Sequence, residues 1–173
     1  PRPDGFFGNC NPKNKKNYRT RCSALISFDK LNILIDTSPD LRQQLLDAKI
    51  KTINGVLYSH FHADQTHGIN DLRAFFLNNK IKIPIYCNEI TSKYLKNNND
   101  YDSMLKLNKL KKKIKIKMLK NSLEILAIPV KHGSINSIAY IIEKKIAYIS
   151  DVNEIYLKDM RYFKKLKYLI IDC

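Results

Sequence analysis

The sequence predicts a single domain, spanning residues 1–173, of mixed α/β or α+β class. Short runs rich in Ile, Leu, Val and Tyr recur along the chain and have the length and composition of β-strands. Segments with helical spacing lie between some of these runs, and other runs are joined by turns short enough for hairpins. Hydrophobic residues make up 44% of the chain, which is enough for the core of one domain of this length.

The first half is expected to begin with a loop, because residues 1–22 are polar and contain Gly, Pro and Asn. Strands are then predicted at Ser23–Phe28, Asn32–Asp36, Ile53–Tyr58 and Ile83–Cys87. Helices are predicted from Pro39 to about Ala48, at Asn70–Leu77 and at Glu89–Lys96. Ser38 is the expected N-cap of the first helix, with Pro39 in its first position.

The second half is expected to be richer in strands. Residues 97–113 abound in Asn and Lys and are interpreted as a solvated insertion. Strands are predicted at Ile114–Met118, Ser122–Pro129, Ser137–Glu143, Ile146–Ser150 and Tyr168–Asp172. A short helix is expected at Glu154–Phe163, before the last of these strands. Hairpin-like strands interrupted by helices predict mixed sheets with helices on the outside.

Composition restricts the cellular setting and the partners. No apolar run approaches the roughly 20 residues of a membrane span, so no membrane association is expected. Thirty-one Lys and Arg against 16 Asp and Glu give a net charge of +15, which suits an anionic partner such as a phosphorylated substrate or a nucleic acid. A general bias toward Lys and Asn explains the same charge without a nucleic acid, and we favour it because aromatic residues are not interleaved. A homodimer is compatible with the sequence.

The four cysteines, Cys10, Cys22, Cys87 and Cys173, form no CxxC pair and do not resemble a secreted disulfide framework. Free thiols in a reducing cytoplasm are therefore expected. Cys10 and Cys22 flank a basic loop, where a zinc site is the alternative to free thiols.

A cluster of histidines is the strongest functional signal. Three of the four histidines lie within Tyr58-Ser-His60-Phe-His62-Ala-Asp64-Gln65-Thr-His67-Gly68, directly after an apolar strand. Alternate residues of extended chain point to the same side, so His60, His62 and Asp64 can converge at the mouth of that strand. Imidazole and carboxylate are ligands for zinc, manganese or iron, so a metal site is predicted here. The alternative is a set of hydrogen-bonded surface or core histidines.

The order of strand, HxHxD and helix resembles the first metal motif of the metallo-β-lactamase superfamily. The flanking segments are similar to phosphoribosyl cyclic-phosphate phosphodiesterases and to hydrolases encoded beside lipoate-synthesis genes. These segments are Pro1-Arg-Pro-Asp-Gly5, Asn17-Tyr-Arg19-Thr-Arg21-Cys22-Ser23, Leu34-Ile-Asp36-Thr-Ser-Pro39-Asp40-Leu-Arg42 and His67-Gly-Ile-Asn-Asp71-Leu-Arg73. The resemblance implies an αβ/βα four-layer sandwich and a metal-dependent phosphodiesterase. It also implies a fragment, because family members have a further first strand and a further C-terminal part.

Two more ligands are implied by the resemblance. His132 follows the apolar run 125–130 and takes the family's third-motif position. Asp151 ends a predicted strand and matches the fourth motif, where an aspartate bridges two metals. A structural histidine and a turn aspartate are the respective alternatives.

Gln65 departs from the family pattern, which has histidine directly after Asp64. A neutral amide oxygen is a weaker ligand for a transition metal than imidazole. We therefore favour one tightly held zinc or manganese ion, bound by His60, His62, His132 and Asp151. A second ion would have Asp64, Asp151 and Gln65 as its ligands.

The chemistry that follows is attack on phosphorus by a metal-bound hydroxide. Asp64 is expected to orient the water or take its proton. His67 either donates a proton to the leaving oxygen or braces the ligands, and we favour bracing. Arg73, and Arg19 or Arg21 from the opening loop, have guanidinium groups suited to a substrate phosphate. For Arg73, ion pairing with Asp71 or Asp40 is an equal alternative, and Asp36 and Asp40 are expected to be structural.

Three functions remain open at this point. The favoured one is a phosphodiesterase acting on a small cyclic or ribosyl phosphate. A nuclease of the same superfamily, acting on RNA, is supported by the positive charge. A catalytically silent metal-binding module is supported by Gln65 and by the absent late histidine. Hydrolysis of a β-lactam or a thioester is also compatible with the same scaffold, because a fold does not fix a function.

Overall fold

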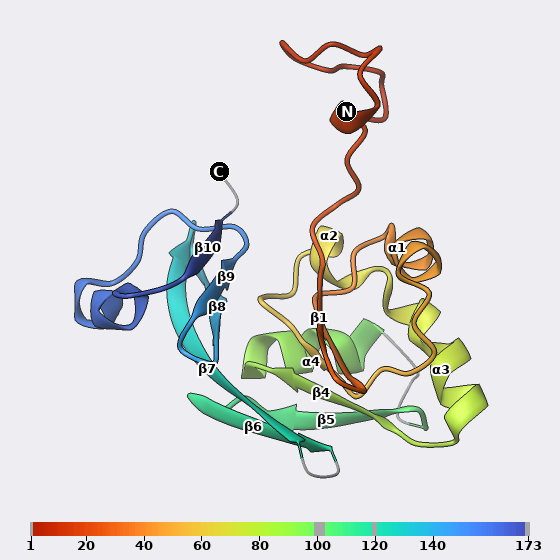
Figure 1. Ribbon diagram of the computed structural model, residues 1–173, viewed down its shortest axis with the longest axis vertical. Helices are drawn as coiled ribbons and strands as arrows, with labels where there is room; N and C mark the ends of the chain where they lie inside the picture. The colour runs from red at the N-terminus through yellow and green to blue at the C-terminus, as the bar shows by residue number, and fades with distance from the viewer. Residues whose placement is uncertain (1, 99–102, 119–120, 172–173) are drawn as a thin grey trace.

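The computed structural model describes residues 2–98, 103–118 and 121–171, which form two sheets set face to face (Figure 1). The N-terminal sheet has the order β1-β2-β3-β4-β5. Its strands are β1 (Ala24–Phe28), β2 (Leu31–Ile35), β3 (Gly55–Leu57), β4 (Ile83–Cys87) and β5 (Leu105–Lys109). β1 is antiparallel to β2, whereas β2 to β5 are mutually parallel. The carboxyl ends of β2, β3 and β4 therefore lie at one edge of the sheet.

The C-terminal sheet has the order β10-β9-β8-β7-β6. Its strands are β6 (Lys113–Met118), β7 (Asn121–His132), β8 (Ile135–Ile142), β9 (Ile146–Ile149) and β10 (Tyr168–Ile171). Neighbours from β6 to β9 are antiparallel, and β10 runs parallel to β9. Because β7 and β9 are each antiparallel to β8, their carboxyl ends share one edge of this sheet.

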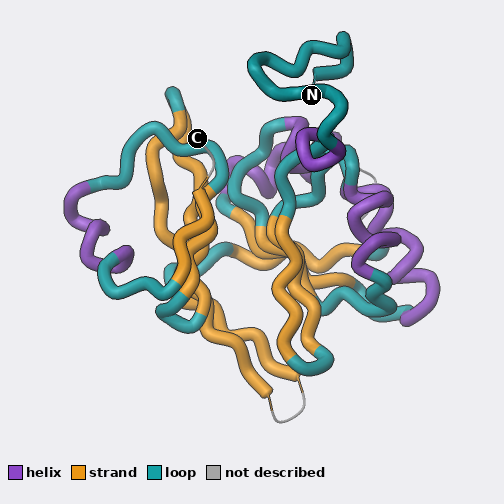
Figure 2. Tube along the Cα trace, turned by 45° about the horizontal axis from the view of Figure 1, so that its top comes forward, coloured by secondary structure: helices purple, strands orange, loops and turns teal. Residues whose placement is uncertain are grey.

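Helices cover the outer faces of the sheets (Figure 2). The α-helices are α1 (Leu41–Ala48), α2 (Ala63–Thr66), α3 (Leu72–Asn79) and α4 (Glu89–Asn98), and the 3-10 helices are η1 (Lys15–Asn17), η2 (Ile69–Asp71) and η3 (Leu157–Phe163). Leu41, Leu72 and Leu95 from α1, α3 and α4 pack in one buried cluster with Val56 and other residues of the N-terminal sheet. Side chains of the η3 region pack against the outer face of the C-terminal sheet. This order of helices, sheet, sheet and helix is the predicted four-layer arrangement.

The space between the sheets is filled by a second apolar cluster. Ile33, Ile35 and Leu57 of the N-terminal sheet meet Ile125 and Tyr140 of the C-terminal sheet, and all five side chains are fully buried. Burial of each such side chain contributes about 1.5–3 kcal/mol, so this interface holds the two sheets in register at the edge where the histidines lie.

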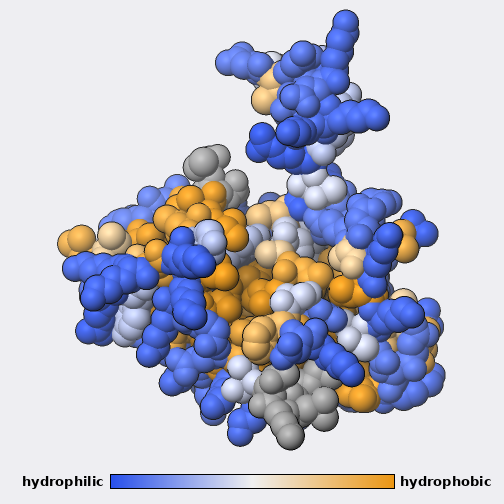
Figure 3. Space-filling view, viewed as in Figure 1, coloured by the Kyte–Doolittle hydropathy of each residue, from blue (hydrophilic) through white to orange (hydrophobic). Residues whose placement is uncertain are grey.

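The surface is mostly hydrophilic on the face shown in Figure 3, with an apolar area over β10. The β10 side chains Tyr168, Leu169, Ile170 and Ile171 are 43–55% exposed. The opening loop, which includes η1, extends away from the two sheets (Figure 1). Among the described residues, no helix has both the length and the apolar character that crossing a membrane would require.

Most predicted elements are confirmed within a few residues, and three expectations differ from the structure. Part of the solvated insertion is strand β5, whose Leu105 and Leu107 pair with Ile83 and Ile85 of β4. Lysine and asparagine alternate with the apolar residues of β5, so its composition does not indicate a strand. Such a composition is common on edge strands. Residues 99–102 of that segment, and Asp172 of the last predicted strand, lie outside the described residues.

The first helix begins later than its predicted cap indicates. α1 starts at Leu41 with Asp40 in the N-cap position, and the Ser38 hydroxyl accepts a hydrogen bond from the Asp40 N–H at 3.3 Å. Ser38 thus stabilises a turn before the helix, and Pro39 lies in that turn. The predicted helix at 154–163 is also shorter and tighter, since only Leu157–Phe163 are helical and they form 3-10 turns.

Candidate metal centre

Three imidazoles from the two sheets meet at the edge described above. His60 and His62 follow β3 and precede α2, whereas His132 is the last residue of β7. The His60 Nε2 atom lies 3.0 Å from His62 Nδ1, and His132 Nε2 lies 3.4 Å from the same Nδ1. One nitrogen from each ring lies within 4.8 Å of the others, which is a spacing that a single cation can bridge. The imidazoles separated by some seventy positions therefore share one centre.

A pair of carboxylates and an amide extend this cluster. Asp151, which follows β9, places its Oδ2 atom 3.5 Å from His60 Nε2. The Gln65 side-chain Nε2 donates to Asp151 Oδ2 at 2.9 Å and to Asp64 Oδ2 at 3.2 Å. Asp64 is exposed and Gln65 is buried. The centre thus has a nitrogen-rich side and an oxygen-rich side, with Asp151 between them.

His60 is held by a buried chain of hydrogen bonds. Its Nδ1 atom lies 3.1 Å from the Ser59 hydroxyl, and that hydroxyl donates to Asp36 Oδ2 at 2.7 Å. The other Asp36 oxygen accepts the Ser59 N–H, also at 2.7 Å. Asp36, Ser59 and His60 are all completely buried. This chain fixes the His60 ring and leaves Nε2 directed at the other imidazoles, as in metal sites whose ligands are oriented by outer hydrogen bonds.

The C-terminal sheet also forms hydrogen bonds with the segment that follows β3. The Tyr140 hydroxyl of β8 donates to the Tyr58 carbonyl at 2.7 Å, and the Ile138 N–H donates to the Ser59 carbonyl at 3.0 Å. The Tyr58 hydroxyl lies 2.7 Å from the Thr37 hydroxyl in the segment after β2. These buried bonds set the position of the histidine motif relative to β8.

The contacts that hold His132 in place lie at the surface, unlike the buried hydrogen bonds around His60. The N–H of Gly133, which has a positive φ of 56°, donates to the Asn153 side chain at 2.6 Å. The backbone of Lys131 pairs with Glu154, and the charged groups of this exposed pair lie 3.6 Å apart. These contacts tie the β7–β8 turn to the segment that follows Asp151, so His132 and Asp151 are linked through the same surface region.

The protonation states fit a cation site. Burial lowers the pKa of His60 to about 4, with further lowering from the neighbouring His62 and His132 rings, so His60 is neutral near pH 7. Neutral imidazole is the form that binds metal. Burial raises the pKa of Asp36 to about 7, against the lowering effect of its bonds to Ser59. Three imidazoles beside one carboxylate suit zinc or another borderline transition metal.

The remaining predicted residues lie apart from the imidazoles or are paired elsewhere. The His67 Nε2 atom lies 3.1 Å from the Tyr94 hydroxyl of α4, on the exposed side of the motif. Arg21 forms an ion pair with Asp40 at 3.1 Å, in addition to a backbone bond to the same carboxylate. Arg73 is exposed on α3 and, within the described chain, forms no ion pair with Asp71 or Asp40.

The cysteines do not form a second metal cluster in the described residues. Cys10 has an exposed free thiol, whereas the Cys22 sulfur lies 2.9 Å from the Tyr148 hydroxyl. The buried supports Ser59 and Tyr140 and the exposed support Asn153 were not predicted from the sequence. Ser59 could have been found from its place beside His60, whereas only the fold brings Tyr140 and Asn153 to the site.

Two facing sheets with imidazoles gathered at one edge define a class of α/β sandwich built to hold a metal. Residues 31–173 match the family described as the Beta-lactamase superfamily domain, and the chain belongs to that superfamily. Over 171 residues it is 30% identical to an octanoyltransferase of Porphyromonas gingivalis (strain ATCC BAA-308 / W83). That match covers 94% of this chain but only 34% of the relative.

Solved structures share the fold. The crystal structure of a diphosphatase from the PhnP family superposes with a TM-score of 0.82 at 27% identity, covering 93% of this chain and 66% of the diphosphatase. Zinc-bound PqqB from Methylobacterium extorquens has a TM-score of 0.70 at 19% identity, over 89% of this chain and 60% of PqqB. The chain therefore spans about two thirds or less of each of these proteins.

Proposed function

We propose that this protein is a metal-dependent hydrolase and, more specifically, a phosphodiesterase acting on a small cyclic or ribosyl phosphate. The convergence of His60, His62 and His132 carries the proposal, because it provides a nitrogen-rich cation site at a sheet edge. The likeness to a diphosphatase of the PhnP family supports a phosphate-containing substrate. A bound zinc or manganese ion would supply Lewis acidity and a water that ionises near neutral pH.

The side chains of this chain have separate tasks in the proposed reaction. His60, His62, His132 and Asp151 would hold the cation. Asp64 has an exposed carboxylate held by Gln65, and it orients the attacking water and accepts its proton.

Two further tasks concern the substrate and the motif. We assign binding of the substrate phosphate to Arg73 rather than Arg21, since Asp40 already engages the Arg21 guanidinium. His67 braces α4 through Tyr94, so we assign it a positioning role.

Hydrolysis of bis(4-nitrophenyl) phosphate by the complete protein, loaded with zinc or manganese, tests the proposal. Turnover should fall about 100-fold or more in His132→Ala, because loss of a ligand costs at least as much as loss of an outer hydrogen bond. His67→Ala should fall less than about tenfold, since that ring does not touch the imidazole cluster. A protein that binds metal but leaves phosphodiesters intact would overturn the proposal in favour of a silent metal-binding module.

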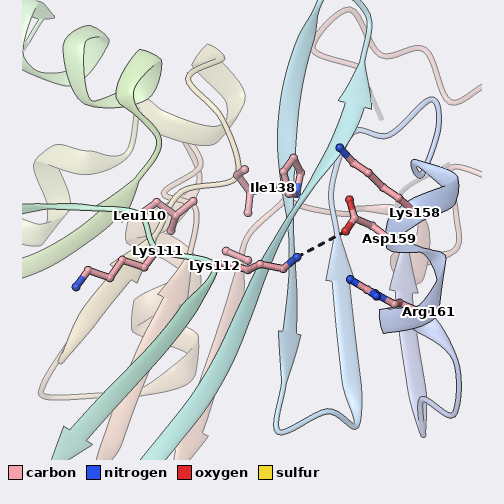
Figure 4. A pocket seen from close by; sticks show the side chains of 9 residues that line it. Leu110, Lys111, Lys112, Ile138, Lys158, Asp159 and Arg161 are labelled. Atoms are coloured by element: carbon pink, nitrogen blue, oxygen red, sulfur yellow. Dashed lines mark ion pairs between the residues drawn. The ribbon is translucent and has the colours of Figure 1, made fainter.

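A nuclease remains the second candidate because of one cavity. Lys111, Lys112, Lys158 and Arg161 line a cavity of about 430 Å³, with Asp159 as its acidic residue. Figure 4 shows Lys158, Asp159 and Arg161 on the opposite side of the cavity from Lys112. Lys112 lies 3.8 Å from the Asp159 carboxylate, so the lining keeps an excess of positive charge. Such a lining suits the backbone of a single-stranded RNA.

Salt dependence separates the two functions. Turnover or binding of RNA should weaken with ionic strength, with a log–log slope of roughly 0.7 per phosphate contact. Lys112→Ala together with Lys158→Ala should reduce that slope by about one unit or more. Hydrolysis of the small diester should change little with salt or with this double substitution, since the cavity lining includes none of the three imidazoles.

A further inference from the structure

Gln65 occupies a fixed place between two carboxylates. It lies in α2 and is 1% exposed. Its backbone N–H donates to the His62 carbonyl at 3.0 Å, and its carbonyl accepts the Thr37 N–H at 2.7 Å. The residue is thus anchored on both sides of its Cα atom, which leaves only the side-chain torsions free.

The amide group of Gln65 has only one favourable orientation. Its two N–H bonds match two acceptors, because Nε2 donates to Asp64 Oδ2 and to Asp151 Oδ2. Exchanging the amide oxygen and nitrogen would place an acceptor against both carboxylates. The Gln65 Oε1 atom, by contrast, is buried without a hydrogen-bond partner. The Gln65 oxygen is therefore left without a hydrogen bond, while the Gln65 nitrogen donates to both aspartates.

The position between Asp64 and Asp151 is consequently taken by a neutral hydrogen-bond donor. A cation held by both carboxylates would have to displace this amide or lie against its N–H groups, which carry partial positive charge. On the nitrogen-rich side, by contrast, His60, His62 and His132 direct their ring nitrogens at one another, and no amide of the described residues lies between them. Asp151 serves both sides, because the same Oδ2 atom accepts from Gln65 and lies 3.5 Å from His60 Nε2.

We propose that Gln65 limits this centre to one transition-metal ion. Its amide replaces a second cation between Asp64 and Asp151, and the resulting bridge positions Asp151 for the imidazole-bound ion. The inference rests on the proposed metal dependence. It assigns Gln65 as a positioning residue that sets the metal count, and it leaves Asp64 free of direct metal coordination.

Metal stoichiometry tests the inference without relying on activity. The complete protein is saturated with Zn²⁺, passed over a weak chelating resin and analysed by native mass spectrometry. We expect one ion in the unmodified protein and two in Gln65→His, because imidazole can coordinate where the amide only donates. Asn70→His is the matched control, since it adds a histidine at an exposed position of η2 and should retain one ion.

Manganese loading gives an independent signal. The unmodified protein should show the electron paramagnetic resonance spectrum of isolated Mn²⁺, whereas Gln65→His should show an exchange-coupled pair. Two ions in the unmodified protein, or one ion in a folded Gln65→His variant, would overturn the inference. One ion without diester hydrolysis would defeat the proposed function alone, whereas two ions with hydrolysis would defeat only the inference. Absence of bound metal in the unmodified protein would overturn both.

Discussion

The two sides of the metal centre are built in different ways. The N-terminal side has His60 within the core, where Ser59 and Asp36 are completely buried around it. The C-terminal side has His132 at the tip of the long β7–β8 hairpin, partly exposed and tied to Asn153 through the adjacent turn. One ligand set therefore depends on buried hydrogen bonds, and the other depends on a surface turn and an exposed ion pair.

The two sides therefore have different tasks. Buried hydrogen bonds orient the His60 ring, whereas the β7–β8 hairpin brings His132 to the centre. Buried networks are costly to break, because each donor or acceptor left without a partner loses about 1–3 kcal/mol. Exposed ion pairs contribute about 0–1 kcal/mol, so the Lys131–Glu154 pair adds little to the stability of the hairpin end. We infer that the N-terminal side is preorganised in the metal-free protein and that the C-terminal side is completed when the cation binds.

Removing one ligand from each side should give the largest effects. His60→Ala and His132→Ala should each weaken Zn²⁺ binding by about 100-fold or more, measured by competition with a chromophoric chelator. Only His60→Ala should also destabilise the metal-free protein, by about 1–3 kcal/mol in urea unfolding, because it empties a buried, hydrogen-bonded position. Equal losses of metal-free stability in the two variants would remove the distinction between the sides.

Asp36 offers the next test, because it supports the ring from outside the ligand set. Asp36→Ala leaves both the Ser59 N–H and the Ser59 hydroxyl without their acceptor, which should cost about 2–3 kcal/mol of unfolding free energy. Asp36→Asn is the matched control, since it keeps an acceptor and tolerates the positive φ of 60° at this position. If alanine and asparagine behaved alike, the Asp36–Ser59–His60 chain would not be the support described here.

Much of the fold and the location of the centre could be predicted from local patterns. Short runs rich in Ile, Leu, Val and Tyr identify most strands, and the HxHxD spacing after a strand indicates a cation site. Strand β5 could not be identified in the same way, because its Lys and Asn residues conceal the pairing of Leu105 and Leu107 with β4. The hydrogen bond from Tyr140 to the Tyr58 carbonyl joins residues 82 positions apart. No local signal encodes such a contact.

Gln65 illustrates the same limit at the level of one side chain. The sequence shows that an amide follows Asp64, and amide chemistry predicts a weak ligand. Only the structure shows that the nitrogen, and not the oxygen, faces Asp64 and Asp151. The residue expected as a poor ligand is thereby reinterpreted as a donor that lies between the two carboxylates.

The pH dependence of stability gives a further test of the buried side. Asp36 keeps its proton to about pH 7 when folded, against an ordinary pKa of 3.8. Its contribution to stability is fully present below pH 3.8 and is lost as the pH rises toward 7. Asn does not titrate, so the stability of the unmodified protein relative to Asp36→Asn should fall by up to about 1.4 kcal/mol per pH unit in this range.

Urea unfolding in the presence of a metal chelator, repeated from pH 4 to pH 8, measures this difference. His60 acts in the opposite sense, because its pKa is lowered to about 4 and its contribution is lost on acidification. Both proteins contain His60, so its effect cancels in the comparison. A difference that did not vary with pH would show that Asp36 is ionised in the folded protein.

The smallest expected effect concerns the exposed, C-terminal side of the centre. It tests whether the contacts of the β7–β8 turn help to hold His132 in place. Asn153→Ala removes the acceptor of the Gly133 N–H, and should cost about 1 kcal/mol or less because water can replace this partner at the surface. Zn²⁺ affinity should nevertheless fall about threefold to tenfold, because part of the binding energy must now order the turn that holds His132. Ser134→Ala, at an exposed position of the same turn, is the control and should change neither quantity. Loss of stability without loss of affinity would mean that the hairpin tip holds His132 in place without help from Asn153, and the two sides of the centre would then be equally preorganised.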